Sequence, residues 1–173
     1  MADLARTARD LARAWEAADA AAPPHPQYGK NGRGIGPYEE KPFVAMLHEH
    51  LLRLSSDYVE SRVEVPYPVG GESADLCIGP TASPDLVLEL KYARMKRSDG
   101  RMEEAALSRI LSPYRESALV DCGKVLRFST ALHRGVVIVG YDYPDLPIEP
   151  LIEDFESLAT KRVALGPATG LPL

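Results

Sequence analysis

The chain has 173 residues, of which 45% are hydrophobic and 26% are charged, and this is the composition of an ordinary globular protein. Its length allows one domain with a substantial hydrophobic core and excludes two domains of comparable size. The formal net charge of −5 argues against a protein that coats nucleic acid through charge alone, although it leaves room for a local basic strip. No apolar run approaches the roughly 18–20 residues that a bilayer-spanning helix needs.

The first 22 residues are rich in Ala and Arg, but four acidic residues interrupt them. A secretory signal would need an uninterrupted apolar stretch, and a transit peptide would be poor in acids, so we expect a cytoplasmic protein with no membrane contact. The only two cysteines, Cys77 and Cys122, are too few for a disulfide framework or a four-ligand zinc site. We therefore expect both to be reduced thiols.

Two amphipathic helices are predicted in the first third of the chain. In residues 2–22 the apolar side chains fall near one helix face, and the prolines that follow end this helix. A glycine-rich loop covers residues 27–37. The second helix is predicted over 38–55, where apolar residues again recur at helical spacing.

Four strand signals and three helix signals follow. In chain order, the predicted elements are strands over 58–66, 73–78 and 85–93, helices over 102–111 and 117–128, a strand over 134–141 and a helix over 150–164. This order predicts an α/β domain whose last strand joins the sheet through a helical crossover. We divide the chain into an N-terminal helix with a proline-rich linker, 1–26, a main domain, 27–165, and a tail, 166–173.

The second and third predicted strands carry the residues of chemical interest. If they form a hairpin centred on Ala82, the numbers of paired residues sum to 164, so that Asp75 faces Glu89 with Cβ atoms about 4.5–5.5 Å apart. Alternation along each strand then places Asp75, Glu89 and Lys91 on one face. The opposite face is uniformly apolar and consists of Leu76, Ile78, Leu86, Leu88 and Leu90.

Two carboxylates this close repel each other, and a protein tolerates them when a cation lies between them. Two oxygen donors, completed by waters and a substrate phosphate, suit Mg²⁺, which supplies Lewis-acid charge and lowers the pKa of a bound water. The Lys91 ammonium reaches the same pocket, where it can orient or deprotonate an attacking water, or stabilise charge on the phosphate. Together these groups predict hydrolysis of a phosphodiester.

Asp75, followed fourteen residues later by Glu89-Leu90-Lys91, resembles the motif of the PD-(D/E)XK, or restriction-endonuclease-like, nuclease superfamily. The order of elements from residue 38 to 141 is similar to the α-β-β-β-α-β core of that superfamily, a mixed central sheet flanked by helices. An extra N-terminal helix and a C-terminal helix would be added to this core. The proline of the motif is absent, since Ala74 stands before Asp75.

The resemblance implies an endonuclease that depends on Mg²⁺ or Mn²⁺ and acts on DNA, in restriction, repair or phage defence. Asp75 and Glu89 would bind the metal, and the carbonyl of Leu90 would add a third oxygen. Members of the superfamily often carry another acid on the preceding helix. Glu40 falls within about 20° of the buried stripe, so we expect Glu40 there, with Glu39 next. An ordinary preference of acids for a helix N-terminus explains either residue equally well.

A basic segment follows the motif, and it predicts contact with the phosphate backbone of nucleic acid. A solvated loop is the alternative, since charge runs are usually that. Arg109, on the following helix, occupies a region where the superfamily often has Gln, Lys or Arg. The candidate nucleic-acid-binding residues are Arg94, Lys96, Arg97, Arg101 and Arg109, with Lys30 and Arg33 in the glycine-rich loop.

Two alternatives to a nuclease stay open. One is a non-catalytic module that retains the nuclease fold and binds nucleic acid or protein. The other is a structural role, with Asp75 and Lys91 as a plain cross-strand ion pair, which would leave Glu89 unexplained. Nucleic acid is the expected partner. A homodimer is one expectation, because many members of the superfamily pair to cut both strands, and a partner subunit that supplies recognition is the other.

Overall fold

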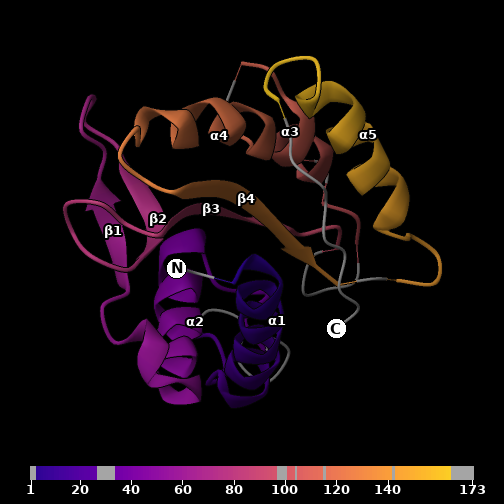
Figure 1. The fold of residues 1–173 in the computed structure, drawn as a ribbon. Helices are drawn as coiled ribbons and strands as arrows, with labels where there is room; N and C mark the ends of the chain where they lie inside the picture. The colour runs from indigo at the N-terminus through magenta and orange to yellow at the C-terminus, as the bar shows by residue number, and fades with distance from the viewer. Residues whose placement is uncertain are drawn as a thin grey trace.

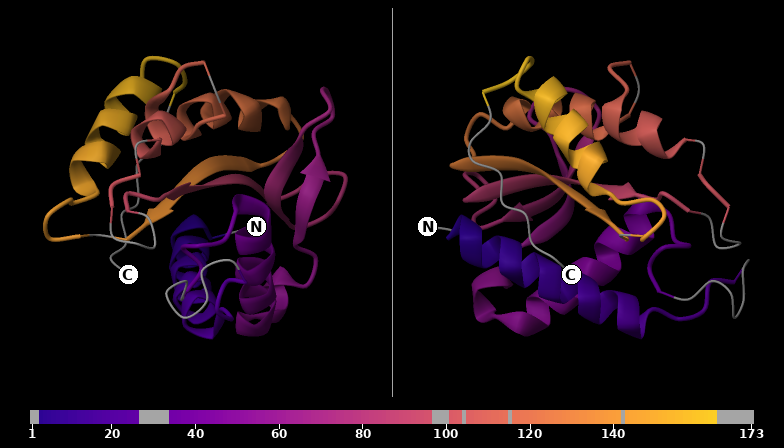
Figure 2. Two further views of the ribbon diagram at one scale, coloured as in Figure 1. Left: turned by 180° about the vertical axis from the view of Figure 1, so that it is seen from behind. Right: turned by 90° about the vertical axis from the view of Figure 1, so that its right-hand side faces the viewer.

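The described residues form three layers, with a four-stranded sheet between two sets of helices (Figure 1). In this computed structural model they are residues 3–26, 34–96, 101–103, 105–114, 116–141 and 143–164. The layer on one face of the sheet contains α1 (Leu4–Ala21) and α2 (Glu40–Leu54). The layer on the other face contains α3 (Ala106–Leu111), α4 (Ala118–Lys124) and α5 (Glu149–Ala159), as the views in Figure 2 also show.

The sheet is mixed and has the strand order β1-β2-β3-β4. The first three strands, β1 (Arg62–Pro66), β2 (Ser73–Ile78) and β3 (Leu86–Ala93), pair antiparallel, whereas β4 (His133–Gly140) lies parallel to β3. Because α3 and α4 lie between β3 and β4 in the chain, β4 reaches the sheet through a helical crossover, as predicted. The α/β arrangement with a mixed, helix-flanked sheet is therefore confirmed.

The predicted register of the β2–β3 hairpin is confirmed. Leu76 pairs with Leu88, Cys77 with Val87 and Ile78 with Leu86, so the paired numbers sum to 164. The apolar face is also confirmed, since Leu76, Ile78, Leu86, Leu88 and Leu90 all belong to one buried cluster.

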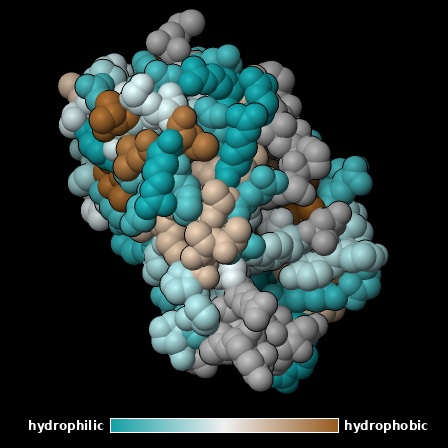
Figure 3. All heavy atoms as spheres, turned by 90° about the horizontal axis from the view of Figure 1, so that it is seen from below, coloured by the Kyte–Doolittle hydropathy of each residue, from teal (hydrophilic) through white to brown (hydrophobic). Residues whose placement is uncertain are grey.

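Both helices of the first layer pack on this apolar face. The ring centroids of Trp15 from α1 and Phe43 from α2 lie 4.9 Å apart at its centre. The Asp3 carboxylate begins α1 by accepting a hydrogen bond from the Arg6 N–H, as N-cap side chains do. Figure 3, which views the molecule from the side of this layer, shows hydrophilic residues together with a group of hydrophobic residues near one edge. None of the helices that the structure describes is long and apolar enough to cross a lipid bilayer.

Four element boundaries differ from the sequence-based expectation by four residues or more, and one of them is the end of α5, at Ala159 and not at residue 164. The first strand begins at Arg62 and not at residue 58, because Ser56–Tyr58 form a 3-10 turn and the Tyr58 hydroxyl donates a hydrogen bond to buried Asp10. α3 begins at Ala106 and not at residue 102. The helix expected over 117–128 is α-helical to Lys124 and continues as a 3-10 turn over Val125–Arg127.

β2 lacks regular ladder partners at Asp75. On the β3 side the pairing ends at Leu76. On the β1 side the opposing position is Glu64, the only described non-glycine residue with a positive φ, 53°. This left-handed conformation is uncommon for a residue with a side chain and interrupts the β1–β2 ladder. The main chain is therefore open on both sides of the position that carries the predicted metal ligand.

Candidate active site

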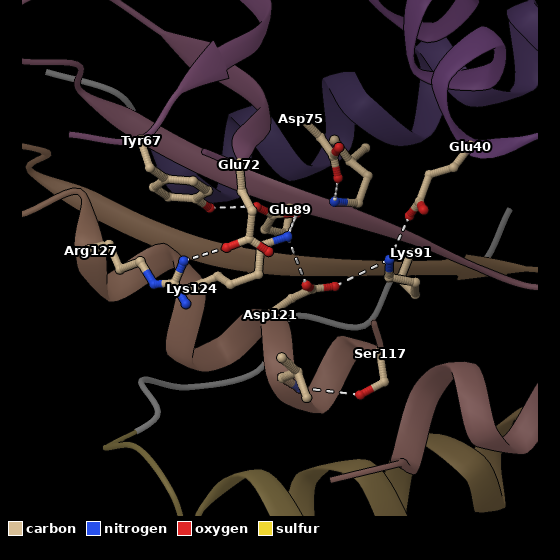
Figure 4. A network of polar contacts seen from close by, with 12 residues as sticks. Glu40, Tyr67, Glu72, Asp75, Glu89, Lys91, Ser117, Asp121, Lys124 and Arg127 are labelled. Atoms are coloured by element: carbon tan, nitrogen blue, oxygen red, sulfur yellow. Dashed lines mark hydrogen bonds and ion pairs between the residues drawn. The ribbon is translucent and has the colours of Figure 1, made fainter. Parts of the chain in front are cut away.

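The four side chains predicted for catalysis come together at this opening, although they belong to three different elements. Glu40 begins α2, Asp75 lies on β2, and Glu89 and Lys91 lie on β3. Figure 4 shows Glu40, Lys91 and Glu89 connected through Asp121 and Lys124 of α4, with Asp75 beside them. Glu89 is 2% exposed and the Asp121 side chain 1%, whereas the Glu40 side chain is 39% exposed, so the network meets solvent at Glu40.

Asp75 bridges the point where β2 and β3 separate. Its Oδ2 accepts a hydrogen bond of 2.7 Å from the Leu90 N–H, in place of a main-chain partner. In a β-strand the N–H and C=O of one residue point to the same neighbour, so the Leu90 carbonyl also faces this gap. Burial raises the pKa of Asp75 to about 6, and the charge of Glu40 adds to the rise. The gap thus presents oxygen atoms from two neighbouring strands.

Both carboxylate oxygens of Glu89 have a donor. Oε1 accepts a hydrogen bond from the Tyr67 hydroxyl, and Oε2 lies 3.3 Å from the Lys124 Nζ. Burial and the charge of Asp75 raise the pKa of Glu89 to about 8. The charge of Asp75 therefore disfavours the ionised form of Glu89, whereas a side-chain hydrogen bond with Glu89 lowers the pKa of Asp75.

Lys91 is buried between two carboxylates. Its Nζ lies 2.8 Å from Glu40 Oε1 and 3.3 Å from Asp121 Oδ2. Burial alone would lower the pKa of this ammonium, but the charges of Asp121 and Glu40 outweigh burial and raise it. Of the two candidate helix acids, the structure brings Glu40 to Lys91, whereas Glu39 is the exposed N-cap of α2.

The ion pairs of Lys91 test the alternative that Asp75 and Lys91 form only a structural ion pair across the strands. Among the described contacts, its partners are Glu40 and Asp121 and not Asp75. A plain cross-strand ion pair between Asp75 and Lys91 therefore has no support in the geometry.

Asp121 and Lys124 were not among the residues expected at the site. Asp121 contacts both site lysines, with Oδ2 3.3 Å from Lys91 and Oδ1 3.2 Å from Lys124. The start of α4 is fixed by Ser117, whose hydroxyl oxygen accepts a hydrogen bond from the Val120 N–H. One signal in the sequence points to Asp121: it lies within a helical stripe whose other members are the buried Ala118, Leu119 and Cys122.

The connection between β1 and β2 closes the Glu89 side of the site. Tyr67 follows β1, is 4% exposed, and packs its ring against Phe128 at a centroid distance of 5.9 Å. Burial and the bond to Glu89 raise the pKa of the Tyr67 hydroxyl, which remains a proton donor. Glu72 forms an ion pair with Arg127, so this connection is tied to the chain that follows α4.

Two of the basic residues predicted to bind nucleic acid have partners within the protein. The Arg94 guanidinium donates a 2.6 Å hydrogen bond to the Tyr38 carbonyl, and Lys96 forms a 2.7 Å ion pair with Asp145. Both cations are therefore engaged within the protein. Arg101 and Arg109 are exposed, Arg109 on α3. Lys30, Arg33 and Arg97 lie outside the described residues.

The donor set can be compared with the expected metal. Within the described ranges, no group of three or more His, Cys, Asp or Glu side chains is arranged to hold a metal ion. The predicted set needs only two such side chains, Asp75 and Glu89, together with the Leu90 carbonyl. Buried carboxylates that share a gap with a carbonyl fit a small hard cation such as Mg²⁺. Each Glu89 oxygen already has one donor, and each has a second lone pair with which it can bind a cation.

No protein-family model, no curated protein and no solved structure matches the chain. Its function is therefore inferred from the residues of the site.

Proposed function

We propose that the chain is a nuclease that depends on Mg²⁺ or Mn²⁺ and hydrolyses phosphodiester bonds in DNA. The observation that carries this proposal is the placement of Asp75 and Glu89, two carboxyls with raised pKa at the point where β2 and β3 separate. The mixed sheet and its helical layers suit a restriction-endonuclease-like core. A setting in restriction, repair or phage defence remains an expectation from the sequence motif.

The charges of the site support a bound divalent cation. The ammonium groups of Lys91 and Lys124 form ion pairs with three carboxyl groups, and Asp75 adds a fourth carboxyl group near Lys91. When all are ionised, the cluster carries an excess of two negative charges. Buried charges without partners are costly, and one divalent cation would compensate this excess. Such an ion supplies Lewis-acid charge and lowers the pKa of a bound water.

Each residue then has a separate role. Asp75, Glu89 and the Leu90 carbonyl would hold the cation. The Lys91 ammonium, fixed by Glu40 and Asp121, would stabilise negative charge on the phosphate in the transition state. Two carboxylates around one ammonium favour this electrostatic role over proton abstraction by Lys91. Because Glu40 marks the solvent-exposed end of the network, we expect the phosphate to approach from that side.

Cleavage assays test the proposal. Plasmid, single-stranded DNA and RNA are incubated with the protein and Mg²⁺ or Mn²⁺, beside EDTA and an Asp75→Asn/Glu89→Gln variant. Glu49→Gln is the matched control, because Glu49 is an exposed acid of α2. We expect metal-dependent cutting of DNA that the control retains and the double variant loses. A folded protein that cuts none of these substrates and binds no Mn²⁺ would contradict the proposal.

A non-catalytic binding module is the second candidate, and one observation favours it. Tyr67 and Lys124 already occupy both oxygens of Glu89, as in a network that serves only to hold the fold together. In that case Glu89→Gln and the wild type would bind nucleic acid equally well in the presence of EDTA. A nuclease would instead lose its metal-dependent cutting in Glu89→Gln.

A further inference from the structure

The Tyr67 side chain, which touches the site, is held in place by its own contacts and by those of its neighbours. Its N–H donates a 3.0 Å hydrogen bond to the Glu72 carbonyl, and Glu72 is ion-paired with Arg127. Its ring is buried against Phe128. The hydroxyl therefore reaches Glu89 Oε1 from a ring that has little freedom to move.

The two donors on Glu89 differ in charge. The Tyr67 hydroxyl is neutral, whereas the Lys124 ammonium is positive. A divalent cation on Glu89 repels a nearby ammonium but not a hydroxyl. Lys124 also has a second partner, since its Nζ is 3.2 Å from Asp121 Oδ1. It can therefore leave Oε2 without losing all of its ion pairs, while Tyr67 keeps Oε1.

We propose that Tyr67 is a positioning residue, which holds Oε1 of Glu89 so that Oε2 faces the cation site beside Asp75. This inference rests on the proposed function, because it concerns Glu89 as a metal ligand. Groups that orient a metal ligand by hydrogen bonding raise metal affinity, and their removal typically costs about 10–100-fold in affinity or activity. Tyr67 lies in the β1–β2 connection, and the sequence motif did not predict it as a residue of the site.

The test is Mn²⁺ binding by Tyr67→Phe, measured by calorimetry on the full chain. This substitution keeps the ring and its contact with Phe128 and removes only the hydroxyl. Tyr58→Phe is a matched control, because Tyr58 is also 4% exposed and also donates its hydroxyl to a carboxylate, Asp10 Oδ2 at 2.7 Å. Asp10 belongs to α1, on the opposite face of the sheet. All proteins are measured below the unfolding transition of the least stable variant.

We expect the dissociation constant for Mn²⁺ to rise about 10-fold or more in Tyr67→Phe and to stay unchanged in Tyr58→Phe. The cleavage rate at saturating Mn²⁺ should fall much less than the affinity, a separation that a general loss of structure would not produce. Equal Mn²⁺ affinity in the two variants would overturn the positioning role. A wild-type chain that binds no Mn²⁺ would instead overturn the proposed function itself, whatever the variants do.

Discussion

The substitution Asp121→Asn tests whether α4 is held to the sheet by charge. Asp121 is buried and contacts the ammonium groups of Lys91 and Lys124 at 3.3 and 3.2 Å. At about 4 Å, two unit charges interact by about 4 kcal/mol at an effective dielectric constant of about 20. Removing one member of a buried ion pair typically costs about 3–5 kcal/mol.

We expect a loss of about 3 kcal/mol in the free energy of unfolding, at the lower end of this range. Each lysine keeps one carboxyl group in contact, Glu40 for Lys91 and Glu89 for Lys124, so each ammonium retains an oxygen acceptor. The total stability of a domain is about 5–15 kcal/mol, so the variant should still fold without denaturant.

Urea unfolding of wild type and variant measures this difference through the shift of the midpoint at constant slope. Asp154→Asn on α5 is the control, because Asp154 is exposed and should change stability by less than about 0.5 kcal/mol. A change in Asp121→Asn as small as in the control would refute the view that these ion pairs anchor α4.

Three further predictions follow from the same geometry. In the folded protein the pKa of Glu89 is about 8 and that of Asp75 about 6, and both lie above the values in the unfolded chain. Protonation of these two groups therefore stabilises the fold. This stabilisation is complete below pH about 4 and is lost as pH rises toward 8. Urea midpoints of the metal-free protein should therefore decrease as pH rises from about 4 to about 8 and level off above that, and Glu89→Gln should flatten the part of this profile above pH about 6. Lys91→Met should reduce cleavage by at least about 100-fold at saturating Mn²⁺, and an unchanged cleavage rate would exclude Lys91 from the reaction. Gly140→Ala should destabilise by about 1–3 kcal/mol, because the added Cβ would lie 2.7 Å from Ile148 and 2.8 Å from the Ala93 carbonyl. Gly123→Ala, in open space on α4, should instead stabilise by about 1 kcal/mol, and thermal unfolding of both variants checks this contrast.

The hairpin that carries the site was predictable because its signals are local. Alternation fixes which side chains share a face, and the register follows once the hairpin is centred on Ala82. For that reason the pairing of Leu76 with Leu88 and the common face of Glu89 and Lys91 follow from the sequence. The position of Glu40 at the start of α2 needed only helical periodicity in addition.

The contribution of α4 and of the β1–β2 connection could not be derived in this way. The sequence places Asp121 in an apolar helical stripe, but its meeting with Lys91 depends on how α4 crosses the sheet, which is a tertiary property. Tyr67 stands between two prolines, outside any periodic pattern. Likewise, Arg94 and Lys96 form a basic run in sequence, yet each finds a partner far away in the chain.

The central claim is that Asp75 and Glu89 share a divalent cation, and anomalous diffraction from crystals grown with Mn²⁺ tests it most directly. We expect a strong peak between the two carboxylates and the Leu90 carbonyl, with ligand distances of about 2.1 Å, as for Mg²⁺. The same peak should be absent from crystals of the Asp75→Asn variant. A saturated crystal of the wild-type protein with no peak at this position, or with its only peak elsewhere, would contradict the account.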